Sequence, residues 1–301
     1  SRGLGDVYKR QIMNEAQLQE IILKTITELV GKEGKESPSP APGPKVDPGE
    51  VPDLSAVDYR KIVDVPNPAN EEEYRLLRAQ TVARLGVWRA GPRYRTNTFL
   101  RFRADHAVAM DAVFTDVPEA LLEEMGLFSV QTLCDSKDTY LTRPDLGRRL
   151  SDETVAELRK RCVLNPDVQI VVSDGLSSTS VSANIRDVLP AILQGLKSSG
   201  VTVGTPFFIK YGRVGAMDAV TEALGAKVTV ILLGERPGLA TGESMSAYMT
   251  YGGYVGIPEA NRTVVSNIHR GGTTPTEAGA FIAELCLRML REKASGLDLK
   301  V

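Results

Sequence analysis

The sequence predicts an α/β fold, with a doubly wound, mostly parallel, Rossmann-like C-terminal domain, a helical N-terminal region and a disordered N-terminal tail. Two observations lead to this prediction. From residue 165 onward, short apolar runs alternate with helical segments, the pattern of an α/β domain. Residues 51–150 instead show helical patterns joined by long polar connections. We therefore expect a helix-rich region at 51–150 and the α/β domain at 151–301.

The first fifty residues divide into three stretches. Residues 1–12, which precede Met13 and match nothing that follows, are expected to be a cloning or sequencing-junction scar. Residues 13–30 predict an amphipathic helix, and 31–50, with five Pro, four Gly and two Ser, predict a linker. The apolar stripe of the helix comprises Leu18, Ile21, Ile22, Ile26 and Leu29. A helix on a tether is typical of an interaction segment, although docking on its own domain stays open.

Within 51–150, helical patterns cover 71–86, 97–113 and 118–125, the first ending at Gly86. The run 135–150 reads as polar and irregular. Ser151 then occupies the N-cap position of a helix over 152–162.

An arginine cluster lies between the first two of these helices. It comprises Arg89, Arg93, Arg95, Arg101 and Arg103. Such a cluster is typical either of a surface that binds phosphate or a partner, or of a solvated face paired with Asp and Glu. The sequence leaves both interpretations open.

The C-terminal domain begins with a strand at 168–172, whose continuous apolar run indicates burial on both faces of a parallel sheet. A helix is expected from there to Lys197. Further strands are expected at 201–203, 207–209, 227–233, 246–251 and 263–266, and further helices at 217–224 and 276–293.

Composition excludes several classes of protein. The formal net charge of −2, from 36 Lys and Arg against 38 Asp and Glu, predicts no nucleic-acid partner. No apolar run approaches the roughly 20 residues of a membrane span, and no signal peptide is recognisable, so we expect no membrane partner. Three scattered cysteines and two histidines lack zinc-site spacing. We therefore expect buried thiols in a reducing cytosol and no metal ligands.

Common catalytic motifs do not occur in the sequence. There is no GxGxxG after the first predicted strand, no GxxxxGK[ST] and no GxSxG. Ser177 or Ser178 suits a helix cap better than a nucleophile. Asp174 and Glu235 could pair as acid and base, but nothing in the sequence orients them. Polar and glycine residues do cluster after the predicted strands, where open parallel sheets bind ligands.

Residues 267–272 (NIHRGG) approach the DxHxxG loop in which a histidine becomes the lower cobalt ligand of cobalamin. Here the orienting Asp is Asn267, and only 32 residues follow His269. Both departures disfavour His269 as a cobalt ligand.

The loops that follow the strands carry a family resemblance. SDGLSS, VGTPFFIKYGRVGAMD, LLGERPGL, SNIHRGGTTP and RMLREKASG resemble the small (light) subunit of ethanolamine ammonia-lyase. TVARLGVWRAGPRYRTNTFLRFRADHA and DSKDTYLTRPDLGRRL extend the resemblance to about residues 59–296.

The resemblance implies an adenosylcobalamin-dependent carbon–nitrogen lyase that converts ethanolamine to acetaldehyde and ammonia, active only with its large subunit. In that family the cofactor lies between the two subunits and keeps its own benzimidazole on cobalt. No catalytic residue is therefore expected in this chain. The family's N-terminal tail is linked to packaging in a bacterial microcompartment, which implies that location and a shell or cargo partner for the N-terminal helix.

The family's cobalamin contacts map onto Val214, Glu235 and Val264, the last where relatives can carry Cys. Arg213 and Lys210 are candidate supports for corrin amides or phosphate. The two valines could equally be core residues, whereas Glu235 is a poor core residue. Two other functions stay open: a non-catalytic microcompartment adaptor, and an independent Rossmann-like nucleotide-binding enzyme.

Overall fold

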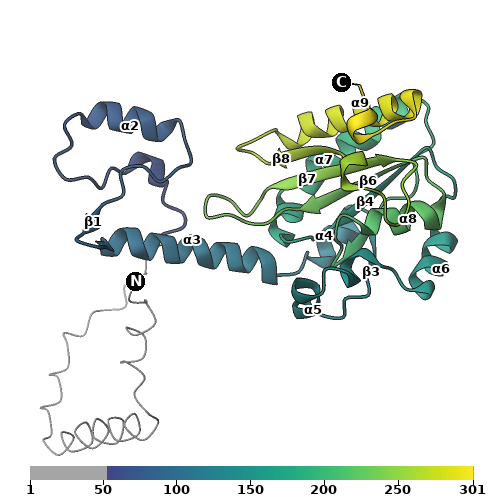
Figure 1. Ribbon diagram of the computed structural model, residues 1–301, viewed down its shortest axis with the longest axis horizontal. Coiled ribbons are helices and arrows are strands. Elements are labelled where there is room, and N and C mark those ends of the chain that lie inside the picture. Colours follow the sequence, from purple (N-terminus) through teal and green to yellow (C-terminus); the bar gives the residue numbers. More distant parts are fainter. Residues whose placement is uncertain (1–52, 301) are drawn as a thin grey trace, which may run out of the picture. The chain divides into compact units, whose positions relative to one another are not determined.

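The computed structural model describes residues 53–300, so the expectations for the scar, the amphipathic helix and the linker lie outside the described residues. Its centre is a six-stranded sheet with the order β3-β5-β4-β6-β7-β8 (Figure 1). The strands are β3 (Phe128–Gln131), β4 (Val168–Ser173), β5 (Phe207–Lys210), β6 (Val228–Gly234), β7 (Met245–Tyr251) and β8 (Thr263–Ile268). The first four are mutually parallel, and β7 and β8 are antiparallel to their neighbours. The fold is therefore mixed α/β with a parallel-rich sheet.

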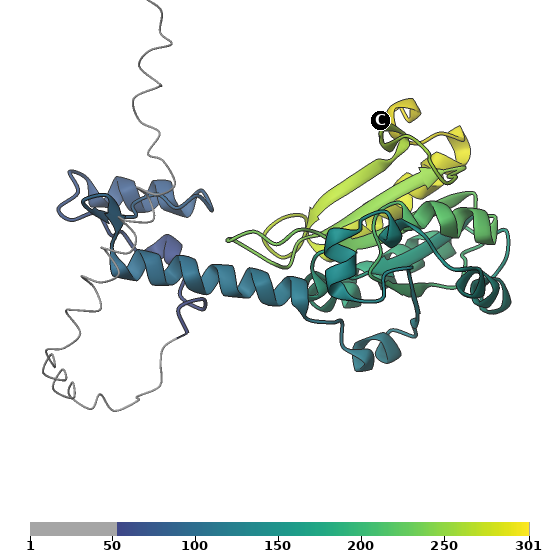
Figure 2. The same ribbon diagram turned by 60° about the horizontal axis from the view of Figure 1, so that its bottom comes forward.

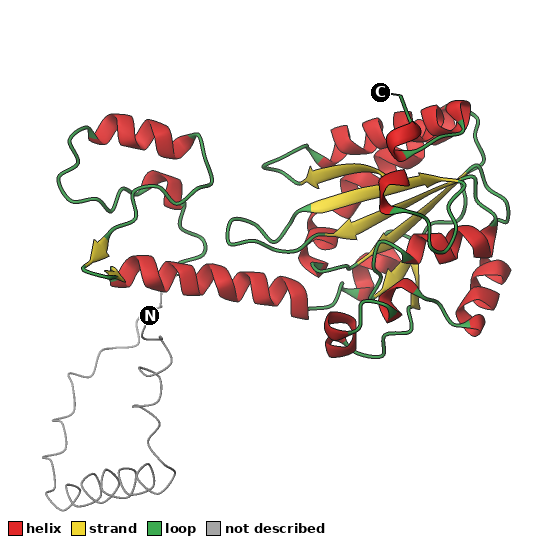
Figure 3. Ribbon diagram, in the orientation of Figure 1, coloured by secondary structure: helices red, strands yellow, loops and turns green. Residues whose placement is uncertain are grey.

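Eight α-helices accompany this sheet in residues 53–300 (Figure 3). They are α2 (Glu71–Ala79), α3 (Thr96–Phe114), α4 (Glu119–Glu124), α5 (Lys137–Thr142), α6 (Asp152–Arg161), α7 (Ser178–Ser198), α8 (Ala216–Leu224) and α9 (Pro275–Glu292). A two-stranded hairpin, β1 (Arg89–Ala90) and β2 (Arg93–Tyr94), precedes α3. Short 3-10 helices lie at Tyr59–Lys61, Leu146–Arg148, Glu259–Asn261 and Gly296–Asp298.

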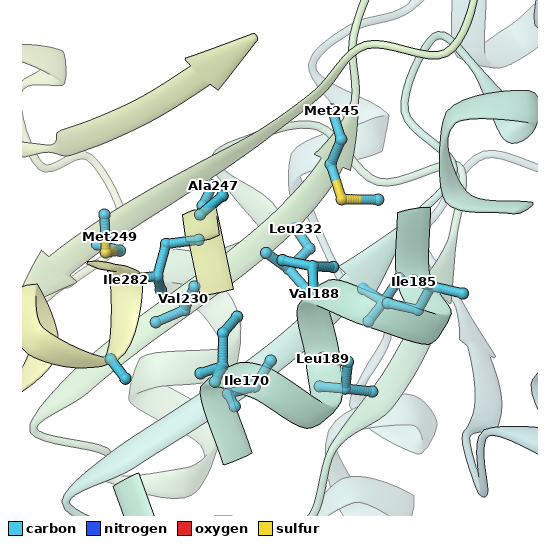
Figure 4. Packing of buried hydrophobic residues seen from close by; sticks show 14 of the residues in the cluster. Ile170, Ile185, Val188, Leu189, Val230, Leu232, Met245, Ala247, Met249 and Ile282 are labelled. Atoms are coloured by element: carbon cyan, nitrogen blue, oxygen red, sulfur yellow. The ribbon is translucent and has the colours of Figure 1, made fainter. Parts of the chain in front are cut away.

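Helices cover both faces of the sheet, so β4 and β6, which are mainly apolar, are buried along their whole length. Every residue of these two strands is buried, as the continuous apolar runs predict. Helices α7 and α9 cover one face. Figure 4 shows Ile170, Val230 and Leu232 of the strands beside Ile185, Val188 and Leu189 of α7 and Ile282 of α9. On the other face, Met217 of α8 and Leu158 of α6 join the cluster that contains Val171 and Ile231.

Two helix caps follow the sequence prediction. The Ser151 hydroxyl accepts a hydrogen bond from the Thr154 N–H at the start of α6, and the Ser177 hydroxyl accepts one from the Ser180 N–H at the start of α7. Both serines satisfy backbone donors that would otherwise lack a partner. All three cysteines are buried free thiols, also as predicted.

Four local predictions are wrong. Helix α2 ends at Ala79 and not at Gly86, because the chain turns back so that the Arg78 guanidinium donates to the Leu85 carbonyl. The predicted strand at 201–203 is reduced to a single bridge between Val203 and Val168. The run 135–150 contains α5 and a 3-10 turn, and the edge strand β3 lies in a region read as helical. Strand β3 has four residues and pairs only with β5, so its sequence pattern is too short to predict a strand.

None of the helices in the described part of the chain is sufficiently long and apolar to cross a membrane.

Candidate functional site

The candidate site lies beyond the carboxyl ends of β4, β5 and β6. After β4 the chain crosses through α7 to β5 on one side, whereas β6 pairs with β4 on the other side. Such a reversal of direction opens a crevice where α/β sheets bind ligands. Here the backbones are in close contact, since a Cβ on Gly234 would come within 2.2 Å of the Asp174 carbonyl oxygen. Only glycine fits at this position.

Asp174 is the buried polar centre of this edge, with 1% of its surface exposed. Its Oδ1 accepts the Tyr211 N–H at 2.8 Å and the Ser173 hydroxyl at 3.2 Å. Its Oδ2 lies 3.5 Å from the Lys137 ammonium. Burial raises the pKa of Asp174, and Lys137 and the Tyr211 N–H oppose that rise. Burial therefore favours the neutral carboxyl group, whereas Lys137 and the Tyr211 N–H favour the carboxylate.

The backbone of Tyr211 is strained at this point. Its φ of +60° lies in the left-handed region, which bulky side chains rarely adopt. The bond from its N–H to Asp174 helps to hold that conformation. Strain of this kind concentrates at functional sites in proteins.

Lys137, the first residue of α5, is the cation of this edge. Its Nζ lies 5.5 Å and 5.1 Å from the ring centroids of Tyr140 and Tyr211. It is buried and forms no hydrogen bond within residues 53–300. The Nζ is thus a desolvated ammonium held between aromatic rings and a carboxylate.

The residues predicted as cofactor contacts lie on the α8 side of the sheet. Val264 of β8 stands directly opposite Tyr248 of β7, so both side chains point to the same face. The Tyr248 hydroxyl donates to Glu235 Oε1 at 2.7 Å. Val214 and Tyr248 both pack against the same hydrophobic cluster. The structure thus brings Glu235 and Val264 to Tyr248, and Val214 to the hydrophobic cluster on the same side of the sheet.

Val214 and Val264 differ in solvent exposure. Val264 is 45% exposed and presents an apolar surface to the outside, whereas Val214 is half-buried at the start of α8. Val264 therefore does not behave as a core residue. Whether either valine contacts cofactor stays a prediction.

The two basic candidates are engaged with neighbouring groups. Arg213 donates to the Tyr140 carbonyl at 2.8 Å, and its guanidinium lies 4.1 Å from the Tyr140 ring centroid. Lys210 forms an ion pair with Asp116 at 2.9 Å. These contacts fasten α5 and the chain after α3 to the end of β5. A role in ligand binding stays a prediction for both residues.

His269 is bonded locally through both ring nitrogens. Its Nδ1 accepts the Gly271 N–H at 3.1 Å, so Nε2 carries the proton and donates to Asn267 Oδ1 at 2.8 Å. Neither nitrogen of this tautomer offers a lone pair to a metal. Across residues 53–300, no group of three or more His, Cys, Asp and Glu side chains is placed to hold a metal ion.

A hollow of about 700 Å³ adjoins the loops after β6 and β8, between them and residues 55–60 and 78–84. Several arginines line it, and three of them contact neighbouring groups. Arg84 and Arg101 both pair with Asp105, and Arg78 donates to two backbone carbonyls. These contacts hold the N-terminal segments together.

Sequence reasoning missed Tyr248 and Lys137. Tyr248 is recognisable only from the antiparallel register of β7, which places it between Ile231 and Val264. Lys137 meets Asp174 across 37 positions of sequence, through the packing of a short helix. The polar start of α5, with Ser136 as its cap, was the one available signal for that helix.

Comparison with known proteins gives a consistent result. A family model described as "Ethanolamine ammonia-lyase light chain (EutC)" matches residues 71–300. An ethanolamine ammonia-lyase small subunit from Clostridium tetani is 54% identical over 295 residues, covering 96% of this chain and 100% of the relative. Small subunits of the same name from Fusobacterium nucleatum and Listeria innocua are 54% and 52% identical, each again with 96% and 100% covered.

Proposed function

The chain belongs to the ethanolamine ammonia-lyase light chain family, and on this basis we propose that it forms one side of an adenosylcobalamin site whose other side is the large subunit. The complete enzyme converts ethanolamine to acetaldehyde and ammonia. When bound, the cofactor supplies the radical chemistry, and the protein supplies binding, orientation and electrostatics.

The observation that carries the proposal is the grouping of Glu235, Tyr248 and Val264 on the α8 side of the sheet. Tyr248 holds one carboxylate oxygen by a 2.7 Å hydrogen bond, while Glu235 Oε2 has no hydrogen bond within residues 53–300. Val264 adds exposed apolar surface beside it. An acceptor next to an apolar surface suits a flat macrocycle with an amide-bearing rim.

The residues of this edge fit such a group in charge. Lys137 supplies a buried donor, and the contact of Gly234 with Asp174 lets the strand ends lie close together. Both ring nitrogens of His269 are occupied by local hydrogen bonds, which agrees with a cofactor that brings its own lower ligand. These residues would bind and orient the cofactor without taking part in bond making.

The Rossmann-like character of the sheet is part of this proposal. The order β5-β4-β6 places the crevice between β4 and β6, the position at which doubly wound sheets bind cofactors. Asp174 and Glu235 follow those two strands. Both therefore stand where a cofactor would approach.

We extend the proposal to the tail and to location in the cell. The stripe of Leu18, Ile22, Ile26 and Leu29, followed by the linker at 31–50, suits a segment that binds a microcompartment shell or its cargo. The location proposed for the lyase is therefore a bacterial microcompartment.

Reconstitution tests the proposal. The purified chain, the large subunit of the lyase, and both together are each supplied with adenosylcobalamin and ethanolamine, and acetaldehyde is measured. Only the combination should produce acetaldehyde. Turnover by the single chain, or a mixture that stays inactive while a relative's subunits are active under the same conditions, would contradict the proposal.

A further inference from the structure

Exposed apolar side chains are concentrated in one segment of the chain. Of the 21 large hydrophobic residues exposed in the described structure, twelve belong to residues 57–114, although this segment is only about a quarter of residues 53–300. They are Val57, Leu76, Leu77, Val82, Leu85, Trp88, Tyr94, Phe99, Leu100, Val108, Met110 and Phe114. Single exposed apolar residues are normal, but such concentration marks an interaction surface.

Helix α3 shows where this surface faces. Only Thr98, Asp105 and Ala112 are buried among its nineteen residues, and their spacing of seven places them on one line along the helix. At 3.6 residues per turn, the opposite arc of about 100° holds exposed residues. This outward arc, which we call the α3 face, contains Phe99, Leu100, Arg103, Met110 and Phe114. In the views of Figures 1 and 2, no described helix or strand lies along one whole side of α3.

The exposed aromatic area is a substantial part of an interface. Phe, Tyr and Trp side chains bury about 150–250 Å² each, so the four aromatic residues among the twelve, at roughly half exposure, offer about 400 Å². A standard interface buries about 800 Å² on each partner. The aromatic side chains of the segment alone therefore leave uncovered about half of one side of a standard interface. These four are Trp88, Tyr94, Phe99 and Phe114.

The arginine cluster gives the partner's charge. Arg101 pairs with Asp105, but Arg89, Arg93 and Arg103 are exposed and have no carboxylate within ion-pair distance in residues 53–300. Unpaired arginines around an apolar centre fit a partner that presents carboxylates at the rim. A second copy of this chain fits poorly, because a twofold contact would bring Arg103 and its neighbours against their own like charges.

We propose that the large subunit of the lyase docks on the α3 face, with Phe99 and Met110 at its apolar centre and Arg103 facing carboxylates of that subunit. The occupant rests on the proposed function, and on relatives named small subunit and light chain. The surface itself rests on the exposed apolar residues and unpaired arginines.

The test measures affinity for the large subunit without cofactor or substrate, using the large subunit of Clostridium tetani. Phe99→Asp and Arg103→Glu should each weaken binding at least about tenfold, as loss of a central interface contact does. Phe281→Asp is the matched control, since Phe281 is 47% exposed on α9 and Phe99 is 54% exposed on α3. Melting temperatures of all three variants should match the wild type, because these side chains are exposed.

Each other result has a clear meaning. Tight binding by wild type and α3 variants alike would overturn the docking surface and leave the proposed function standing. No binding by wild type would count against the proposed function itself. A homodimer that Phe99→Asp dissociates, with large-subunit binding retained, would assign the α3 face to a second copy and overturn the inference.

Discussion

The hydroxyl of Tyr248 on β7 donates a 2.7 Å hydrogen bond to Glu235 Oε1, just beyond the end of β6. Burial and the bond to that carboxylate raise the pKa of Tyr248 well above its usual value. The tyrosine therefore remains a hydrogen-bond donor at any pH at which the fold is studied. It holds the Glu235 carboxylate through Oε1 and leaves Oε2 without a hydrogen bond in residues 53–300.

Glu235→Ala should weaken cobalamin affinity of the reconstituted complex about ten- to a hundredfold. A hydrogen bond to a charged acceptor contributes about 1.5–3 kcal/mol, and each 1.4 kcal/mol changes a dissociation constant about tenfold. Glu235→Gln keeps an acceptor oxygen and should lose less. Cofactor titration of the three complexes gives the comparison.

The matched control is Tyr248→Phe, which removes the orienting hydroxyl and leaves the carboxylate. We expect only a few-fold loss of affinity, with cooperative melting retained. An affinity that does not change in Glu235→Ala would mean that backbone groups, or the large subunit, hold the cofactor on this side.

Sequence patterns predicted the elements whose signal is local. The buried strands β4 and β6 are continuous apolar runs, and the caps Ser151 and Ser177 precede helical segments. Strand β3 escaped prediction because its pattern FSVQ spans four residues and depends on pairing with β5. Sequence could predict that strand ends meet at one edge, but not which side chains would face each other there.

In the candidate site too, some residues are predictable from local sequence and others depend on tertiary packing. Position after a strand singled out Glu235, and family resemblance added Val214 and Val264. Tyr248 and Lys137 have no local signal, since one depends on antiparallel register and the other on the docking of α5. Contacts between distant segments are properties of packing that a single sequence does not reveal.

Lys137→Met should destabilise the fold, and more strongly at high pH. Asp174 is buried with Lys137 as its cation, and burial already raises its pKa above the value in the unfolded chain. The stability this carboxyl contributes is present at low pH and is lost as pH rises through its folded pKa. Without Lys137 that pKa rises further, so the loss in unfolding free energy grows with pH. Removing one partner of a buried pair costs about 3–5 kcal/mol.

Urea unfolding of Lys137→Met at pH 5 and pH 8 checks this difference. Lys210→Met is the control, because its partner Asp116 is 56% exposed and surface pairs contribute about 0–1 kcal/mol. A loss that is equal at the two pH values would show that Lys137 contributes packing and no charge.

Deleting residues 1–45 should leave reconstituted activity nearly unchanged while encapsulation falls. The apolar stripe predicted at residues 18–29 is too small to form a core, and the predicted linker at 31–50 follows it in the sequence. Activity assays and co-sedimentation with microcompartments measure the two effects. If the shortened chain loses its cooperative melting transition, the helix belongs to the domain.

Asp218 and Arg262 join α8 to the start of β8 and so connect the segments that carry Val214 and Val264. Their side chains are 5% and 3% exposed, and Arg262 Nη2 lies 2.6 Å from Asp218 Oδ2. Burial raises the pKa of Asp218 from 3.8 to about 6, against the opposing effect of Arg262. The folded chain therefore binds this proton more tightly than the unfolded chain, and the stability it contributes is lost as pH rises from about 4 to about 6.

Asp218→Asn removes that titration while keeping the shape and an acceptor oxygen for Arg262. Relative to this variant, the wild-type unfolding free energy should fall by about 2 kcal/mol between pH 4 and pH 7, since one pKa unit corresponds to about 1.4 kcal/mol and part of the titration lies below pH 4. Urea unfolding of both proteins across this range measures the difference. Arg262→Met, which leaves the carboxylate without its cation, should steepen the fall. Parallel stability curves for the wild type and Asp218→Asn would show that Asp218 titrates alike in the folded and unfolded chains.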